Sequence, residues 1–548
     1  MKNKLTFLIL LAILILAFCL RYIDPIKRAD LPPDAGSYSI SAYNLYKYHT
    51  YSYKLMGQFY PPIYPIGYPL LIIPFYMIFG SQPYNAVYCS LFFSLLSIIL
   101  IYLIGKRVAN RPTGVVAALF FTLCPAYIMM GKIISSASLS TFLYLFVFWL
   151  FLKAIAPEQK RNVSLLLLMG LIIGYCVSVR YSNMLIYPAI IVSLIYARNF
   201  KFKLSFREGF IISIGVIIAL IPLLLYNLHA YGSPFTTGYE YWHMGNEFSF
   251  KKFALPHDEG GVSKKGYFIL YINALLGVAK HKYFYPLTML PLILIGGLSI
   301  VLKNKKVISS SKILLMFTVA ITSFHLIFYS SYHVQRHRYF LAIVPFLLLV
   351  GAYSIGSNVP WQKFKWLSKR TLLSGVSCML ALLVIGQWVT YPYVAKVVVK
   401  NGQYKMIKEA EKYLENNAVI ISNLPPVVAE HYFTENSKRT FINGDTVYRG
   451  RWTVIVWAAK KHFKPAVYKS NSAASCKRYS YLFRNNKNVN PLTLNFIYFE
   501  LRKGRPVYLL DSPTSFKRKE FFTLLRKYFI AKKHKENPQL YRLYIKHW

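Results

Sequence analysis

Asp34 is the residue in the first part of the chain that is best placed to do chemistry. Carboxylates are scarce there, because only nine Asp or Glu residues precede residue 400. The segment after Asp34 carries four tyrosines within residues 38–48, with the spacing of a short amphipathic helix. Two interpretations follow: Asp34 caps the helix that begins near Ala35, or it acts as a general base that takes a proton from an attacking hydroxyl.

Cationic side chains form the second candidate group. Arg180 ends one apolar stretch, while His333, Arg336 and Arg338 directly precede another. A guanidinium at the level of lipid head groups can bind a phosphate through two N–H groups, although a terminal arginine can also simply extend from a span to the interface. We expect these four residues to bind a phosphate, since a cationic cluster on the outer face runs against the usual charge bias of membrane proteins.

Aromatic residues near these groups predict contacts with a sugar. Tyr38 lies in the helix after Asp34, Tyr60 and Tyr64 lie in a Pro/Tyr-rich turn, and Tyr239 and Trp242 lie in a second polar loop. Such rings can stack on a sugar, but tyrosine and tryptophan also pack at the aromatic belt of a membrane interface. Both interpretations stay open from the sequence.

The elements that hold these residues are apolar spans. The 548 residues are 55% hydrophobic, with a mean hydropathy of +0.37, and contain repeated apolar runs near the ~20 residues that cross a bilayer. We therefore expect a polytopic α-helical membrane protein with about eleven spans by hydropathy. Tyr68–Phe79 is shorter and fits a re-entrant or interfacial segment. The expected spans are Leu5–Leu20, Val87–Ile104, Val115–Met130 (broken at Pro125), Ser138–Leu152, Ser164–Val179, Met184–Ala197, Phe210–Tyr226, Tyr285–Leu302, Ile313–Tyr329, Phe340–Ile355 and Thr371–Val389.

Lysine and arginine in the short loops predict the orientation. The basic loops alternate along the chain and fall on one side if the N-terminus is cytoplasmic. The same count places a first loop (residues 21–86), a second loop (227–284) and the tail on the outer face. These loops explain much of the net charge of +46, and no nucleic-acid-binding motif is present.

Two domains are expected. Residues 1–390 form the transmembrane domain, and residues 391–548 form a small soluble α/β domain with strands near 418–422, 452–456 and 506–510 and helices near 404–416 and 514–529. From residue 400 onward, 29 Lys or Arg stand against 10 Asp or Glu. This excess favours anionic lipid head groups or an acidic glycan as partners, or is a generic basic surface.

The order of these motifs resembles the GT-C superfamily of membrane glycosyltransferases, in particular the protein O-mannosyltransferase and aminoarabinose-transferase type. The residues that carry the resemblance are an Asp that opens a helix in the first outer loop, a Pro-Pro-x-Tyr-Pro-like turn, a Gly-Ser-Pro loop and an Arg-Tyr-Phe run before a span. They stand here at Asp34, 61–65, 232–239 and 338–340. Two departures stand out. Ala35 replaces a frequent second acidic residue, and the hairpin after Pro125 offers only serines where relatives often have a Glu.

The resemblance implies the reaction. An inverting glycosyltransferase would move a sugar from a polyprenyl-phosphate donor to an acceptor glycan, lipid or protein on the periplasmic side of the inner membrane, as in lipopolysaccharide or glycan biosynthesis. Asp34 would be the general base. The resemblance leaves a divalent metal open as a cofactor, although the loss of the acidic pair counts against it. The six cysteines fit no zinc motif.

Two other classes remain as alternatives. A lipid-linked glycan flippase or another transporter would need charged residues lining the membrane interior, and none is found in the middle of an expected span. A non-catalytic membrane scaffold with a sensing tail would tolerate the loss of Asp34, Arg336 and Arg338 together.

Overall fold

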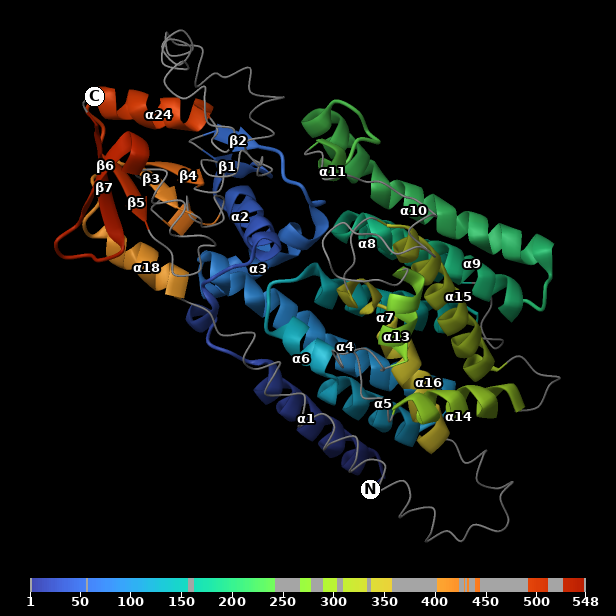
Figure 1. Ribbon diagram of the computed structural model, residues 1–548. Coiled ribbons are helices and arrows are strands. Elements are labelled where there is room, and N and C mark those ends of the chain that lie inside the picture. The colour runs from blue at the N-terminus through green and yellow to red at the C-terminus, as the bar shows by residue number, and fades with distance from the viewer. Residues whose placement is uncertain are drawn as a thin grey trace.

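A bundle of apolar helices and a smaller α/β region at one end of it make up the computed structural model (Figure 1). The structure describes residues 2–55, 58–155, 162–241, 267–276, 289–302, 309–332, 337–356, 402–422, 428, 431–432, 439–443, 491–510 and 526–546. Two of the predicted segments, Thr371–Val389 and Trp452–Val456, lie outside these residues.

The helices of the bundle follow the hydropathy pattern closely. Five of them are long and apolar enough to cross a membrane, or six if the pair α5–α6, bent by 66°, is one span. Shorter apolar helices accompany them, so the number of spans stays a prediction. The helical elements of the bundle are α1 (Lys2–Arg21), η1 (Pro25–Arg28), α2 (Pro33–Tyr48), α3 (Gly67–Phe79), η2 (Pro83–Ala86), α4 (Val87–Val108), α5 (Arg111–Leu123), α6 (Pro125–Gly131), α7 (Ser136–Ala154), α8 (Val163–Val179), η3 (Tyr181–Leu185), α9 (Ile186–Ala197), α10 (Phe202–Tyr231), α11 (Gly238–Tyr241), α13 (Tyr267–Leu275), α14 (Met289–Leu302), α15 (Ser310–Ser331), η4 (His337–Phe340) and α16 (Val344–Gly356).

The α/β region contains a five-stranded mixed sheet of order β4-β3-β5-β7-β6. Strands β4, β3 and β5 are parallel, whereas β7 runs antiparallel to both β5 and β6. Helix α24 packs through Ile497 on one face and helix α18 packs on the other (Figure 1). Most of the helix predicted near 514–529 lies outside the described residues. The elements are α18 (Gly402–Glu411), β3 (Val419–Ser422), β4 (Thr440–Asn443), α24 (Pro491–Arg502), β5 (Val507–Leu510), β6 (Phe529–Lys533) and β7 (Leu540–Ile545); a separate hairpin pairs β1 (Tyr53–Leu55) with β2 (Gln58–Tyr60).

The predicted break at Pro125 separates α5 from α6, and a buried arginine stabilises it. Proline has no N–H, so the carbonyl of Phe121, four residues earlier, keeps only a long bond from the Cys124 N–H, at 3.4 Å, among the described backbone groups. Arg21 supplies a further donor, because its Nη2 donates to Phe121 O at 3.1 Å while its Nε donates to Ser94 Oγ at 2.9 Å. Arg21 is only 1% exposed, and its bonds to backbone and hydroxyl oxygens make it a structural residue of the bundle.

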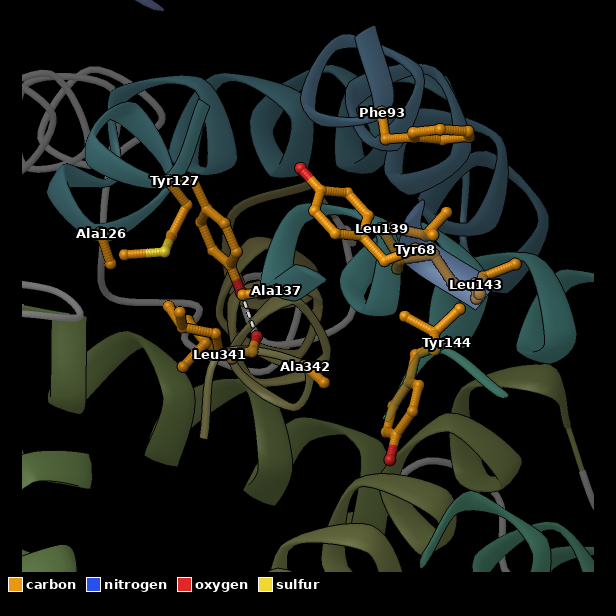
Figure 2. Close-up of a cluster of buried hydrophobic side chains, with 14 of the residues drawn as sticks. Tyr68, Phe93, Ala126, Tyr127, Ala137, Leu139, Leu143, Tyr144, Leu341 and Ala342 are labelled. Atoms are coloured by element: carbon orange, nitrogen blue, oxygen red, sulfur yellow. Dashed lines mark hydrogen bonds between the residues drawn. The ribbon is translucent and has the colours of Figure 1, made fainter. Parts of the chain in front are cut away.

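A second proline leaves a second carbonyl, that of Leu341, without a proline N–H to accept. Pro345 near the start of α16 cannot donate to Leu341 O, and Tyr127 of α6 donates its hydroxyl to that oxygen instead (Figure 2). The ring of Tyr127 is stacked on Phe121 at 4.1 Å between centroids. The broken helix α5–α6 therefore holds the turn between η4 and α16, three residues after Arg338.

We expect Tyr127→Phe to lower the free energy of unfolding by about 1–3 kcal/mol, since it leaves a buried carbonyl without a donor. Thermal unfolding of the purified protein measures this loss. Tyr102→Phe is the matched control, because the hydroxyl of that buried tyrosine makes no hydrogen bond within the described part of the chain.

A Pro345→Ala background tests the physical reason. Alanine restores an N–H that can reach Leu341 O, so Tyr127→Phe should cost clearly less there. An equal cost in both backgrounds would show that the hydroxyl does not replace the missing N–H of proline.

Candidate active site

Asp34 lies in the first turn of α2, where the interpretation as a helix cap is wrong. The N-cap is Pro32, and no side chain caps the helix. The Asp34 carboxylate instead accepts hydrogen bonds from Tyr64 Oη, at 2.7 Å, and from Arg338 Nη2, at 2.5 Å. Its side chain is 36% exposed, so a substrate can still reach it. The contact joins residues 304 positions apart and places the first loop and the η4 segment at the same end of the bundle.

The surroundings of Asp34 keep it ionised. Burial alone would raise the pKa of its carboxyl, but the positive charge of Arg338 and the hydrogen bonds from Tyr64 and Arg338 outweigh burial and lower the pKa below its usual 3.8. Conversely, burial and the neighbouring carboxylate raise the pKa of the Tyr64 hydroxyl, so Tyr64 remains a proton donor to Asp34.

Tyrosine hydroxyls hold the irregular turn that carries Tyr64. The turn contains three prolines, so its carbonyls and remaining amides have few partners within the backbone. Tyr51 donates to Tyr64 O at 2.8 Å, Tyr231 donates to Pro62 O at 2.7 Å, and the hydroxyl of Tyr53 accepts the Ile63 N–H at 3.0 Å. This is a physical reason for the unusual tyrosine content of the first loop.

Gly67 brings this turn next to Arg180. A Cβ at Gly67 would lie 2.5 Å from the carbonyl oxygen of Ser178, so only glycine allows α3 to start against the end of α8. Tyr175 of α8 also donates to Gly67 O at 2.8 Å. Arg180, the residue that ends α8, therefore lies near the Asp34 cluster.

Arg180 and Arg338 give the site an excess of positive charge. The Arg180 guanidinium lies 5.7 Å from the ring centroid of Tyr339, and no carboxylate pairs with it among the described residues. The buried Nε of Arg338 likewise has no hydrogen-bond partner among the described residues. The positive charge of Arg338 opposes protonation of Arg180, and both arginines lower the pKa of Asp34. Two guanidinium groups beside one carboxylate form a site suited to an anion.

Three of the predicted aromatic residues meet beside Asp34. The rings of Tyr38 and Tyr64 are 4.5 Å apart, and those of Tyr64 and Tyr239 are 5.8 Å apart. The hydroxyl of Tyr38 also contacts Ser136 Oγ at 3.1 Å. Tyr60 packs at the edge of the same group with Tyr64 and Tyr239.

Three predicted site residues, His333, Arg336 and Trp242, lie outside the described residues, so their roles stay predictions. Sequence reasoning did not assign Tyr329 or Tyr339 to the site, although their stacked rings, 4.4 Å apart, lie beside Arg180. The position of Tyr339 directly after Arg338 was an available signal. Within the part of the chain that the structure describes, no three His, Cys, Asp or Glu side chains are grouped as a metal site would require.

Known proteins share this fold. Residues 64–226 match the family model of dolichyl-phosphate-mannose-protein mannosyltransferases. ArnT from Cupriavidus metallidurans is similar over 99% of this chain and 98% of its own, with 10% identity and TM-scores of 0.61 in the apo state and 0.63 bound to undecaprenyl phosphate. The oligosaccharyltransferase AglB from Archaeoglobus fulgidus, in complex with an inhibitory peptide and a dolichol-phosphate, is similar over 100% of this chain and 75% of its own, with 11% identity and a TM-score of 0.53. No curated protein sequence matches the chain.

The fold is that of the GT-C superfamily. The resemblance inferred from the order of the motifs is thus confirmed. Together with the apolar helices, the GT-C fold makes the chain an integral membrane protein.

Tyr64→Phe should raise the pKa of Asp34, because it removes one of the hydrogen bonds that lower this pKa. Any activity that needs the carboxylate would then be lost at a higher pH on acidification than in the wild type. The pH profile of kcat/KM measures the shift. Tyr46→Phe, the same change on the exposed side of α2, should leave the profile in place, and an unshifted profile in Tyr64→Phe would contradict the assignment.

Proposed function

We propose that this protein is an inverting glycosyltransferase that moves a sugar from a polyprenyl-phosphate donor to an acceptor on the periplasmic face. The observation that carries the proposal is one accessible carboxylate, Asp34, beside two guanidinium groups at one end of an apolar helical bundle. The bound undecaprenyl phosphate of ArnT and the dolichol-phosphate of AglB support a lipid-linked donor. The sequence contains no phosphate-binding loop for a nucleotide.

In the proposed reaction, an acceptor hydroxyl or amine attacks the anomeric carbon of the donor sugar. A bond forms between the acceptor atom and this carbon, the bond from the carbon to the phosphate oxygen breaks, and Asp34 takes the acceptor proton. The leaving group is the polyprenyl phosphate, whose developing negative charge Arg180 and Arg338 stabilise. Because the attack comes from the side opposite the leaving group, the anomeric configuration inverts.

Arg338 is suited to act on both partners at once. Its Nη2 bonds to Asp34, while 37% of its side chain is exposed, which leaves part of the guanidinium open to a ligand. A planar guanidinium can therefore hold the base with one edge and a phosphate oxygen with another. The rings of Tyr38, Tyr64 and Tyr239 lie where they can contact the sugar.

The transport alternative gains no support from two buried charges of the bundle, Arg21 and Glu208. Arg21 bonds to Phe121 O and Ser94, and Glu208 is paired with Arg198 at 2.8 Å. Each of these charged groups has a structural partner, unlike the charges along a transport path. We further propose the inner membrane as the location, with a cytoplasmic N-terminus and a periplasmic C-terminal domain, from the distribution of basic loops.

Asp34→Asn should lower transfer by at least about a hundredfold, because the amide cannot accept the proton. The assay measures label transferred from radiolabelled polyprenyl-phosphate sugars to acceptors in membranes, at equal expression. Asp24→Asn is the matched control, since Asp24 lies in the same loop and, among the described residues, its carboxylate accepts only the nearby Ile26 N–H. If Asp34→Asn transferred the sugar as well as the wild type, Asp34 would not be the general base.

Arg180→Gln should weaken the binding of polyprenyl phosphate by about tenfold, because it removes one charge-assisted contact. Binding of a short-chain polyprenyl phosphate to purified protein tests this directly, without the transfer assay. Arg107→Gln, which removes an exposed arginine bonded to Leu152 O, is the control. Equal affinities of wild type and Arg180→Gln would exclude Arg180 from the phosphate site.

A further inference from the structure

The C-terminal region touches the segment that carries the candidate base. Asp30, four residues before Asp34, accepts the backbone N–H groups of Gln403 at 3.1 Å and Tyr404 at 2.8 Å. These are amides of the first turn of α18, which otherwise have no partner within the helix. The hydroxyl of Tyr432 also donates to the carbonyl of Ala29 at 2.7 Å. The chain entering α2 is thus bonded to the C-terminal region at two successive residues, Ala29 and Asp30.

Helix α2 itself packs against the same region through Gly36. A Cβ at Gly36 would overlap the Cγ2 methyl of Val428, a residue that is only 5% exposed. Successive residues of a helix are about 100° apart, so Gly36 points away from Asp34, which is two positions earlier. One side of the first turns of α2 therefore meets Arg338 and Tyr64, and the other side meets the C-terminal region.

We propose that the C-terminal region positions Asp34: its docking on α2 through Asp30 and Gly36 holds the carboxylate where it meets Tyr64 and Arg338. Asp30, Gly36 and Val428 are positioning residues in this view, not catalytic ones. The expected effect on kcat rests on the proposed function. The docking of the C-terminal region on α2 does not. It explains why the smallest residue occupies a helix interior, where glycine is unfavourable unless close approach requires it.

Gly36→Ala is the most direct test. Alanine is a better helix former than glycine, so any loss of kcat must come from the clash with Val428. The branched side chain of Val428 has little rotamer freedom to avoid the new methyl group, so the clash moves α2 away from Arg338. We expect kcat for transfer to fall by about ten- to a hundredfold, as small displacements of a reacting group commonly cause. The affinity for polyprenyl phosphate should change by less than about threefold, since Arg180 is not part of this contact.

The double variant Gly36→Ala/Val428→Ala should recover kcat to within about threefold of the wild type, because the smaller side chain removes the overlap. Gly402→Ala adds the same methyl at the start of α18, where nothing lies within 4 Å, and should leave kcat unchanged. A general loss of helix stability would not be rescued by a change in another domain.

Asp30 gives a second, independent pair of variants. Asp30→Ala removes the acceptor for the first amides of α18, whereas Asp30→Asn keeps an oxygen that caps a helix about as well. Transfer should therefore fall in Asp30→Ala and be largely retained in Asp30→Asn.

Amide hydrogen exchange over residues 33–48 of the full-length protein provides a readout that needs no substrate. Exchange should be faster in Gly36→Ala and Asp30→Ala than in the wild type, and it should slow again in the double variant. The positioning role would be overturned if Gly36→Ala had the kcat and the hydrogen exchange of the wild type. It would also be overturned if Gly36→Ala lost kcat and adding Val428→Ala did not restore it. Absence of transfer in the wild type with every donor would instead count against the proposed function, while the exchange experiment still decides the inference.

Discussion

The ion pair between Asp34 and Arg338 is the contact on which the rest of the site depends. It joins the first loop to the η4 segment across 304 positions of sequence, and both side chains are little more than one third exposed. In such surroundings a charge is weakly screened, so each partner stabilises the ionised state of the other. The other site elements either orient this pair, as Tyr64 does, or add charge beside it, as Arg180 does. A bundle that separated the two segments would have neither the base nor the anion site.

Unpaired backbone groups explain much of the architecture around that pair. The prolines at 125 and 345 lack the N–H that would reach the carbonyls of Phe121 and Leu341, and distant side chains donate to these carbonyls. In the Pro/Tyr turn, tyrosine hydroxyls serve the carbonyls and amides in the same way. In a low-dielectric interior each such group is costly if left unpaired. Irregular backbone near the membrane is thus tolerated here because specific arginine and tyrosine side chains satisfy it, and that irregular backbone carries Tyr64 and Arg338.

The sequence predicted the apolar helices that the structure describes, the break at Pro125, the GT-C resemblance and the neighbourhood of Asp34, Arg338 and the tyrosines, whereas the number of spans stays a prediction. These features depend on local composition, periodicity and motif order, which are readable along the chain. The partner of Asp34 was not readable, since an aspartate in the first turn of a helix looks like a cap until a residue 304 positions away is known to bond it. For the same reason, the sequence assigned no function to Gly36 or Asp30. Their contacts with Val428 and with the first turn of α18 exist only after the C-terminal region docks.

The low pKa of Asp34 limits how the proposed transfer can proceed. Any carboxylate is a far weaker base than the alkoxide of a free hydroxyl, and the positive charge of Arg338 weakens Asp34 further by lowering its pKa. In the proposed transfer, Asp34 therefore takes the acceptor proton while the acceptor oxygen bonds to the anomeric carbon, when that proton has become acidic. Negative charge develops on the leaving phosphate in the same step, beside Arg180 and Arg338. The arginine that weakens Asp34 as a base is thus also placed to stabilise the leaving group.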